Sequence, residues 1–368
     1  MKLYIGLISG TSMDGVDAAL VAFPDGGATT VATHSVPIPD DLTCELHALA
    51  QDPSAAAIRF WTADAQLGSV FADAVLALLD IAGTEAHNVA AIGSHGQTVY
   101  HAPKAAIPIT VQLGDPNIIA ERTGITTVAD FRRRDLAAGG EGAPLATAFH
   151  RAVFSAPGVE RGILNLGGIA NLSVLSAERD RPPLGFDTGP ANTLLDTYVR
   201  RRFATDMDRE AALARQGKMV PALLAELLAE PYFDRAPPKS TGRELFNAAW
   251  LDARLARHPG VDPHDVLRTL CELTVETAMG AVTRFAPRTR ELYLCGGGAR
   301  NPLIAERIAE RIAPLRVDTT DLLGIAPDWV EAAAFAWLAM RTLGGEAGNA
   351  PSVTGAGREV VLGGIHPA

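Results

Sequence analysis

The feature that most constrains this chain is a pattern of glycine turns that occurs twice. A buried strand near the start runs into the turn Gly10–Gly15 and a returning strand, and a similar hairpin at 161–176 surrounds Gly167-Gly168. Short apolar strands that end on glycines follow in each half, over 89–93 and 291–295. The order of hairpin, helix and glycine-ended strand therefore predicts two related domains.

Helices fill the stretches between these strands. Ala-rich and Leu-rich segments predict helices over 55–82 and 328–343. Asn301-Pro302 predicts a capped helix start, because a cap residue precedes a proline in the first turn. Alternating strands and helices indicate an α/β fold class with largely parallel sheets.

The segment Asp130–Pro144 is dense in Arg, Gly and Asp, which predicts a domain boundary near residue 130. We therefore expect an N-terminal α/β domain over 1–130 and a C-terminal α/β domain over 131–368. The tail from Gly344 is rich in Gly, Ala and Pro, but 359–362 could still pair as a strand and pack back on the first domain.

The composition narrows the class of protein. A length of 368 residues suits two domains, and a net charge of −10 argues against binding a nucleic-acid backbone. Three scattered cysteines favour a reducing compartment. The start resembles a first strand more than a signal peptide, and we expect no apolar stretch near the roughly 20 residues of a membrane helix. These features predict a cytoplasmic protein without membrane or nucleic-acid partners.

The turn Gly10–Asp17 is the strongest local signal. Two glycines and two hydroxyls between buried strands direct backbone N–H and O–H groups into one concavity, which suits phosphate oxygens. It is not a P-loop, because no Gly-Lys-Ser/Thr follows. Asp14 and Asp17 could hold hydrated Mg²⁺. The alternative is an ordinary hairpin turn.

Two further glycine turns support a nucleotide site. Gly167-Gly168 has Asn165 and Asn171 beside it, and Gly296-Gly297-Gly298 lets a backbone approach a ligand closely. Three such turns in a duplicated α/β fold favour a nucleotide in an interdomain cleft.

Three other segments carry side chains suited to catalysis or binding. Asp187 follows a short apolar strand and precedes the turn Gly189-Pro190, where a carboxylate could serve as a general base or merely cap a helix. His95 is more typical of a hydrogen-bonding residue than of a catalyst. The run Arg132–Arg134 could bind an anion or lie on a solvated surface.

Sequence strings over nearly the whole chain add a family resemblance. They are GLISGTSMDGVDAAL, GSHGQTVYH, TVQLGDPNIIAERTGITTVADFRRRDLAAGGEGAPL, LNLGGIANLS, GFDTGP, PPKSTGRELFN, LCGGGARNP, PDWVEAAAFAWLA and PSVTGA. Together they resemble the anhydro-N-acetylmuramic acid kinases, a branch of the sugar kinase, actin and heat-shock chaperone ATPase superfamily. The resemblance implies two related domains of the actin-like ATPase (ribonuclease H-like) type flanking an interdomain cleft, with ATP, Mg²⁺ and a homodimer.

The resemblance and the glycine turns together give the candidate site. Asp187 matches the catalytic aspartate, and the sugar contacts would come from Thr98, Arg132, Arg133, Asp187 and Glu331. The ATP-binding residues would be Gly10, Thr11, Ser12, Met13, Asp14, Gly15, Val16, Asp17, Gly167, Gly168, Asn171, Gly296, Gly297 and Gly298, with Asp14 holding the metal through water. Two positions depart from the family, which usually has Gly at Ala191 and Gln at Glu141.

The expected reaction is the ATP-dependent opening and O6 phosphorylation of anhydro-N-acetylmuramic acid in cell-wall recycling. One carboxylate is sufficient, because the γ-phosphoryl group can capture the departing O6. A sugar kinase that acts on a free hydroxyl and an actin-like or chaperone-like ATP switch are the alternatives.

Overall fold

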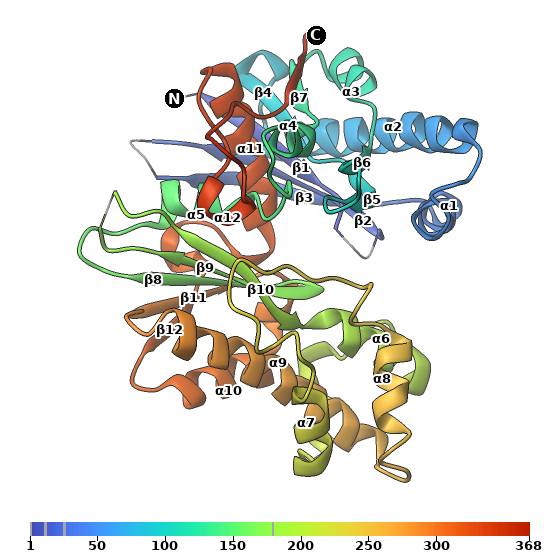
Figure 1. Cartoon of the computed structure of the whole chain (residues 1–368). Helices are drawn as coiled ribbons and strands as arrows, with labels where there is room; N and C mark the ends of the chain where they lie inside the picture. Colours follow the sequence, from blue (N-terminus) through green and yellow to red (C-terminus); the bar gives the residue numbers. More distant parts are fainter. Residues whose placement is uncertain (1, 11–12, 25–26, 179) are drawn as a thin grey trace. The chain divides into compact units, whose positions relative to one another are not determined.

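The computed structural model describes residues 2–10, 13–24, 27–178 and 180–368, which form two compact units (Figure 1). Unit 1 comprises residues up to 154 together with 329–368, and unit 2 comprises 155–328. The division therefore differs from the boundary expected near residue 130. Helices α4 (Phe131–Ala137) and α5 (Ala146–Phe154) stay with unit 1, because α4 packs on β6 (Ile109–Leu113) and α5 on α11 (Val330–Leu343).

Unit 1 is built on a sheet of six strands in the order β13-β7-β4-β1-β2-β3. Its strands are β1 (Leu3–Ile8), β2 (Gly15–Ala22), β3 (Thr29–Pro37), β4 (Val89–Ser94), β7 (Thr127–Ala129) and β13 (Gly364–His366). The first three are antiparallel, whereas β4 is parallel to β1 and β7 is parallel to β4. The tail strand pairs antiparallel with β7, two residues beyond the segment predicted for it.

Unit 2 repeats this topology in a sheet of five strands, β10-β9-β8-β11-β12. They are β8 (Arg161–Leu166), β9 (Ile169–Leu175), β10 (Leu184–Pro190), β11 (Glu291–Cys295) and β12 (Arg316–Thr319). Again the first three are antiparallel, and the last two run parallel to β8. The predicted α/β class with two related units is confirmed.

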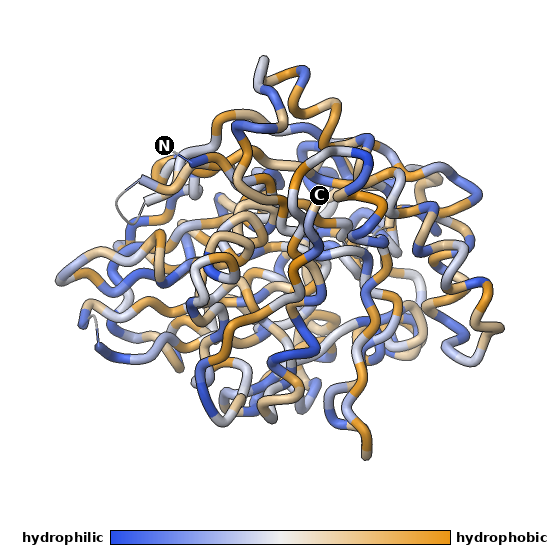
Figure 2. The backbone as a smooth tube through the Cα atoms, turned by 90° about the horizontal axis from the view of Figure 1, so that it is seen from above, coloured by the Kyte–Doolittle hydropathy of each residue, from blue (hydrophilic) through white to orange (hydrophobic). Residues whose placement is uncertain are grey.

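Helix α2 (Ala57–Ala82) is the longest in unit 1, and Gly83 ends it in the left-handed conformation. By length and composition it could cross a membrane, so the expectation that the chain has no such apolar stretch is wrong. Leu67, Phe71 and Val75 are buried, and the helix packs on α3 (Pro116–Thr123) and β3. It is thus a core helix of unit 1. Figure 2 shows hydrophobic and hydrophilic segments distributed along the whole backbone.

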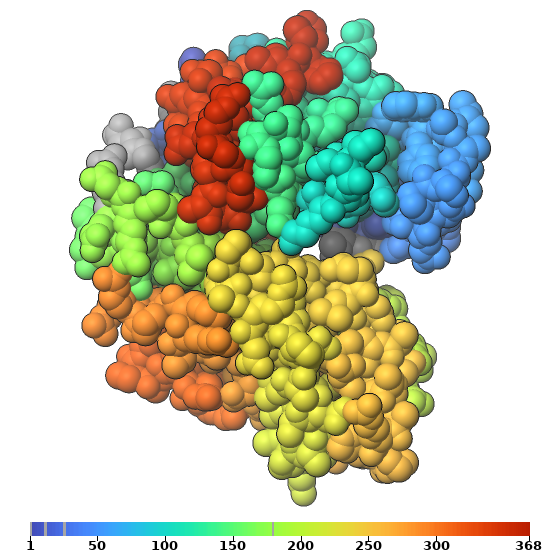
Figure 3. All heavy atoms as spheres, viewed as in Figure 1, coloured from blue at the N-terminus to red at the C-terminus, as the bar shows by residue number. Residues whose placement is uncertain are grey.

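Helix α11 lies directly on β1 and β4 because two strand positions lack a side chain. A Cβ at Gly6 would overlap the carbonyl of Ala332, and one at Gly93 would overlap that of Phe335. Glu331 is in the first turn of α11 and therefore belongs to unit 1, together with β1, β2 and α4. The C-terminal residues, red in Figure 3, lie against the green segment that follows β7.

In the described part of unit 2, five longer helices form one core together with the sheet. They are α6 (Asn192–Phe203), α7 (Pro221–Leu228), α8 (Ala248–Leu255), α9 (Pro263–Phe285) and α10 (Pro302–Ile312). The predicted cap of α10 is confirmed, because Asn301 Oδ1 accepts hydrogen bonds from the N–H groups of Leu303 and Ile304, both at 3.1 Å. Helix α9 is buried over most of its length and forms the centre of the core of unit 2.

Candidate active site

Asp187 lies within β10, at a bulge between Asp187 and Gly189, and not after the end of the strand as the sequence suggested. Its Oδ2 accepts a hydrogen bond from Thr241 N at 3.0 Å. Its backbone carbonyl accepts one from Tyr232 Oη at 2.8 Å, and its backbone N–H donates to Lys239 O at 3.3 Å. No cap of α6 comes from a side chain, so Asp187 is not a helix cap. Asp187 is a partly exposed residue, and the Thr241 N–H orients its carboxylate at Oδ2.

The two glycine turns of unit 2 meet at the end of β8. A Cβ at Gly296 would overlap Asn165 Oδ1, and one at Gly298 would overlap the carbonyl of Leu166, which explains the glycines there. The carbonyls of Gly167 and Gly168 accept from the first N–H groups of α6 at 3.0–3.1 Å. Asn171 pairs with Asp187 across β9 and β10. The structure thus brings the predicted glycine turns and Asp187 together in one unit, with Gly297 in the same turn.

Ala191, where the family usually has Gly, is accommodated by the fold of unit 2. Its φ is negative, at −127°, and its methyl is buried in the core cluster of unit 2. Its N–H donates to Gly168 O at 3.0 Å. The added methyl therefore fills core space rather than the turn.

The N-terminal turn is only partly described, since Thr11 and Ser12 lie outside the described residues. Gly10 O accepts from Met13 N at 3.2 Å, and Met13 has a φ of +60°. The side chains of Met13 and Val16 belong to the core of unit 1, so only their backbone can contact a ligand. Asp14 is exposed, and Gly15 and Asp17 are at the start of strand β2. An exposed carboxylate on this loop fits a hydrated Mg²⁺ ion.

Arg132 is the one arginine of its run that points into unit 1. Its Nε donates to His95 Nε2 at 3.0 Å, and its Nη1 donates to Gly142 O at 2.8 Å. Arg133 instead pairs with Asp130 on the exposed side of α4, and Arg134 is exposed. Burial and Arg132 hold the pKa of His95 well below its usual range, so His95 is a neutral acceptor. The hydrogen-bonding interpretation of this histidine is thereby supported.

Glu331 is electrostatically coupled to Arg132. Desolvation raises the pKa of the Glu331 carboxyl, Arg132 opposes this rise, and the negative charge of Asp17 adds to it. The residue as a whole is exposed. Burial lowers the pKa of Arg132 to about 10, and Glu331 and Asp135 favour its charged form. Arg132, the carboxylates Glu331 and Asp17, and the neutral His95 therefore lie near one another in unit 1.

Thr98 belongs to β5 (Gln97–Ala102), in a polar hairpin with β6. Its Oγ1 accepts from Gln112 Nε2 at 3.1 Å, which leaves its own hydroxyl hydrogen available to a ligand. Glu141, where the family usually has Gln, pairs with Lys104 at 3.0 Å. The extra negative charge of Glu141 is thus offset within unit 1.

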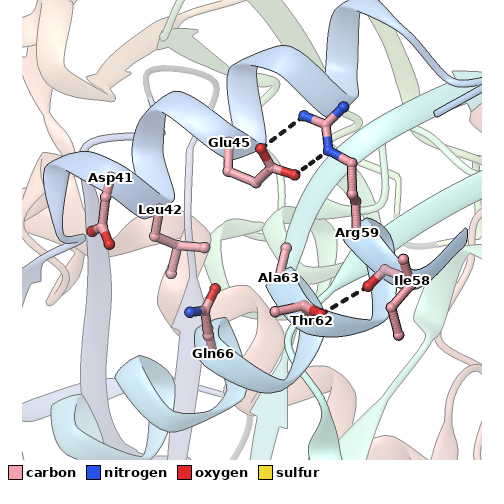
Figure 4. Close-up of a pocket in the computed structure, with 8 residues that line it drawn as sticks. All are labelled: Asp41, Leu42, Glu45, Ile58, Arg59, Thr62, Ala63 and Gln66. Atoms are coloured by element: carbon pink, nitrogen blue, oxygen red, sulfur yellow. Dashed lines mark hydrogen bonds and ion pairs between the residues drawn. The ribbon is translucent and has the colours of Figure 1, made fainter. Parts of the chain in front are cut away.

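The described residues contain no group of three or more His, Cys, Asp or Glu side chains that could hold a metal directly. A surface hollow of about 310 Å³ lies between α1 (Asp40–Gln51) and α2, with Arg59 and Glu45 paired at its rim (Figure 4). None of the predicted site residues lines this hollow.

Sequence reasoning gave no role to Lys239 or Tyr232, and it included Asp135 only as the end of the loop Arg132–Asp135 that was expected to contact the sugar. Lys239 stands in the string PPKSTGRELFN and is one of only four lysines in the chain, which was the available signal. Asp135 is fully buried, which the charge pattern of its segment did not indicate.

The structure thus combines two repeated α/β units, close-packed glycine turns, a carboxylate held by a backbone N–H and an inward-pointing arginine. Comparison with known proteins makes this specific. The sequence model of the family described as anhydro-N-acetylmuramic acid kinase matches residues 2–368. Curated relatives of that name from two strains of Coxiella burnetii, Dugway 5J108-111 and RSA 493 / Nine Mile phase I, are 49% identical over 363 residues, which cover 99% of this chain and 97% of theirs.

The chain therefore belongs to the anhydro-N-acetylmuramic acid kinase family, and the family, function and enzyme class predicted from the sequence are confirmed. Among solved structures, an activator of 2-hydroxyisocaproyl-CoA dehydratase from Clostridium difficile with bound ADPNP has a TM-score of 0.48 and 12% identity, over 91% of this chain and 92% of that one. A ROK family glucokinase from Streptomyces griseus has a TM-score of 0.39 and 15% identity, over 91% and 98%. These likenesses are too weak to carry function to this chain.

Proposed function

We propose that this chain uses ATP to phosphorylate O6 of 1,6-anhydro-N-acetylmuramic acid while water opens the internal ring. The products are N-acetylmuramic acid 6-phosphate and ADP, formed in the recycling of peptidoglycan. In the substrate O6 is bonded to C1, so no free 6-hydroxyl exists. Water oxygen bonds to C1 as the C1–O6 bond breaks, O6 bonds to the γ-phosphorus as ADP leaves, and one proton is released.

The general base in this proposal is Asp187. The observation that carries it is the half-buried carboxylate on the bulge of β10, whose Oδ2 accepts from Thr241 N at 3.0 Å. A carboxylate oriented at one oxygen and accessible to solvent can take a proton from an attacking water. Its backbone is also bonded at both N–H and C=O, so the base has a fixed position.

One carboxylate suffices because the leaving oxygen O6 itself accepts the γ-phosphoryl group of ATP. A glycosidase needs a second carboxyl group to protonate the leaving oxygen. Here the leaving O6 attacks phosphorus, so its developing charge passes to the phosphate ester without a general acid. Backbone donors and positive charge near the transferred group supply the remaining stabilisation.

We assign the ligand contacts by chemistry. Arg132, Arg133 and Thr98 bind the sugar together with Glu331, since a guanidinium suits the lactyl carboxylate of the substrate. Of the two arginines, Arg132 has the inward orientation. The turn Gly10–Asp17 and the glycine turns of unit 2 bind the phosphates and nucleotide of ATP through backbone N–H groups.

Three further features belong to the proposal. Asp14 holds Mg²⁺ through water, and the ion neutralises phosphate charge when ATP is bound. The active form is a homodimer, which rests on the family resemblance alone. The protein works in the cytoplasm, in keeping with its three free cysteines.

The deciding experiment is turnover in ¹⁸O-labelled water, read promptly by NMR and mass spectrometry. We expect the label on the anomeric hydroxyl, none in the phosphate ester, and the α-anomer first, because water attacks the face opposite O6. Label in inorganic phosphate with the anhydro ring intact would mean simple ATP hydrolysis and would overturn the proposal. A faster reaction with the open sugar would instead identify a kinase for a free hydroxyl.

A further inference from the structure

The segment 232–241 contacts Asp187 at three separate atoms. Tyr232 Oη donates to its carbonyl at 2.8 Å, Lys239 O accepts from its N–H at 3.3 Å, and Thr241 N donates to its Oδ2 at 3.0 Å. The position of the carboxylate therefore depends on a segment about 50 residues further along the chain. That segment has no helix or strand between α7 and α8 to hold its shape.

The side chain of Lys239 ties the two ends of this segment together. Its Nζ donates to Tyr232 O at 3.3 Å and to Phe233 O at 3.2 Å, and it lies 4.7 Å from the centre of the Tyr232 ring. Only 5% of the residue is exposed. Among the described residues, no carboxylate lies within 4.0 Å of this ammonium group, so carbonyl oxygens and aromatic faces take the place of an ion pair.

We infer that Lys239 is a positioning residue for the general base: its ammonium group closes the segment 232–241 around Asp187. The inference rests on the proposed function, because it assumes that Asp187 is the base. Lys239 has no assigned contact with either substrate, and it acts through Tyr232 and Thr241, which hold the carbonyl and the carboxylate of Asp187.

The charge of Lys239 indicates that this position serves more than packing. A buried ammonium without an ion pair destabilises a fold, and an apolar side chain of the same length would fill the space without that cost. Burial lowers the pKa of Lys239 to about 8, with Arg235 and Arg284 adding to the shift and Asp187 and Asp234 opposing it. Glu276 of α9 lines the same hollow as Lys239 and Arg284. The Lys239 ammonium group therefore loses its proton within the pH range in which the enzyme can be assayed.

The test is Lys239→Met, which keeps the length of the side chain and removes its donors and charge. We expect kcat to fall about tenfold or more, while KM for ATP and for the anhydro sugar changes by less than about twofold. Wild-type kcat should decline above about pH 8, and this alkaline limb should be missing in the variant. Lys218→Met, at an exposed lysine of the same unit, is the matched control and should leave kcat and the pH profile unchanged.

Two further measurements keep the inference open to refutation. In the Asp187→Asn background, Lys239→Met should add little further loss, because it acts through Asp187. If Lys239→Met does not fold, Lys239→Gln, which keeps a donor but removes the charge, is measured instead, and an unchanged kcat in that variant contradicts the inference. Wild-type kcat and pH profile in Lys239→Met would also overturn it. Failure of the proposed function shows separately, as ¹⁸O in inorganic phosphate from the wild-type enzyme.

Discussion

Asp187 in unit 2 and Arg132 in unit 1 are both held by a segment distant in the sequence, but the two charge arrangements are opposite. The segment around Asp187 is closed by a buried cation, Lys239, on carbonyl oxygens. The loop around Arg132 is closed by a buried anion, Asp135, on neutral donors: Asn349 Nδ2 at 2.8 Å, Thr354 Oγ1 at 2.9 Å and Gly142 N at 2.8 Å.

The difference reflects the charge of the residue being held. Gly142 N donates to Asp135, and Gly142 O accepts from Arg132, so a buried carboxylate supports a guanidinium through a single residue. In unit 2 a buried ammonium supports a carboxylate through Tyr232 and Thr241. Each supporting charge is opposite in sign to the residue it holds. This arrangement predicts that changes in unit 2 act on kcat and changes in unit 1 act on KM for the sugar.

The largest effect is expected from Asp187→Asn. The amide keeps the size of the side chain but removes the base, so kcat should fall by at least about 10²-fold with ATP and sugar binding retained. Calorimetric binding of both ligands and steady-state kinetics measure the two parts. Near-normal turnover would mean that Asp187 is not the general base and that the two units do not differ in the way described above.

Arg132→Gln should mainly raise KM for the sugar, by about tenfold or more, because a neutral amide cannot replace a bidentate cation at a carboxylate. Arg134→Gln is the matched control, since Arg134 is exposed on the same helix and has no proposed contact with the sugar. Equal effects of the two substitutions on KM would mean that the inward orientation of Arg132 has no functional weight.

Thr354→Val tests the support of Arg132 from the C-terminal segment. The loss of one donor to a buried carboxylate should lower the free energy of unfolding by about 2 kcal/mol and raise KM for the sugar a few-fold. Thr62→Val removes a local bond to Ile58 O at an exposed position of α2 and should do neither. Denaturant titration and kinetics would show whether stability falls without any change in KM, which would limit the segment to a structural role.

Acid should destabilise unit 1 through its buried histidines. Burial lowers the pKa of His150 to about 3 and that of His95 well below 6.5. The unfolded chain binds a proton at each of these histidines near pH 6.5. The contribution of His150 to the free energy of unfolding is therefore fully present above pH 6.5 and is lost as the pH falls toward 3, at about 1.4 kcal/mol per pH unit, and His95 acts in the same direction. His150→Leu should flatten the loss of thermal stability between pH 7 and 4.5.

The smallest effect is expected at Glu141. Its pair with Lys104 is partly exposed, and such pairs contribute less than about 1 kcal/mol. Glu141→Gln, which restores the usual residue of the family, should change the melting temperature little and KM for the sugar by less than about twofold. A large gain in sugar affinity would indicate that the charge of Glu141 opposes the substrate carboxylate.

Much of the fold could be predicted because it depends on local patterns. The hairpins around Gly10–Gly15 and Gly167-Gly168, the capped helix at Asn301 and the duplicated order of elements all follow from periodicity and turn residues. The division between units was placed near residue 130 and lies at 154, because the packing of α4 and α5 has no signal in their own sequence. Asp187 was expected after its strand but lies within it, since a β-bulge depends on pairing with β9.

The sequence by itself determined the family, the duplicated α/β class and the residue types of the candidate site, because these are fixed by motifs of a few neighbouring residues. Only the tertiary structure decided which arginine points inward, where Glu141 finds its counter-charge, and that Lys239 and Asp135 are buried. Each of these depends on contacts between residues far apart in the chain, such as Asp135 with Thr354. Burial and the resulting pKa shifts arise only when those segments pack together and exclude water.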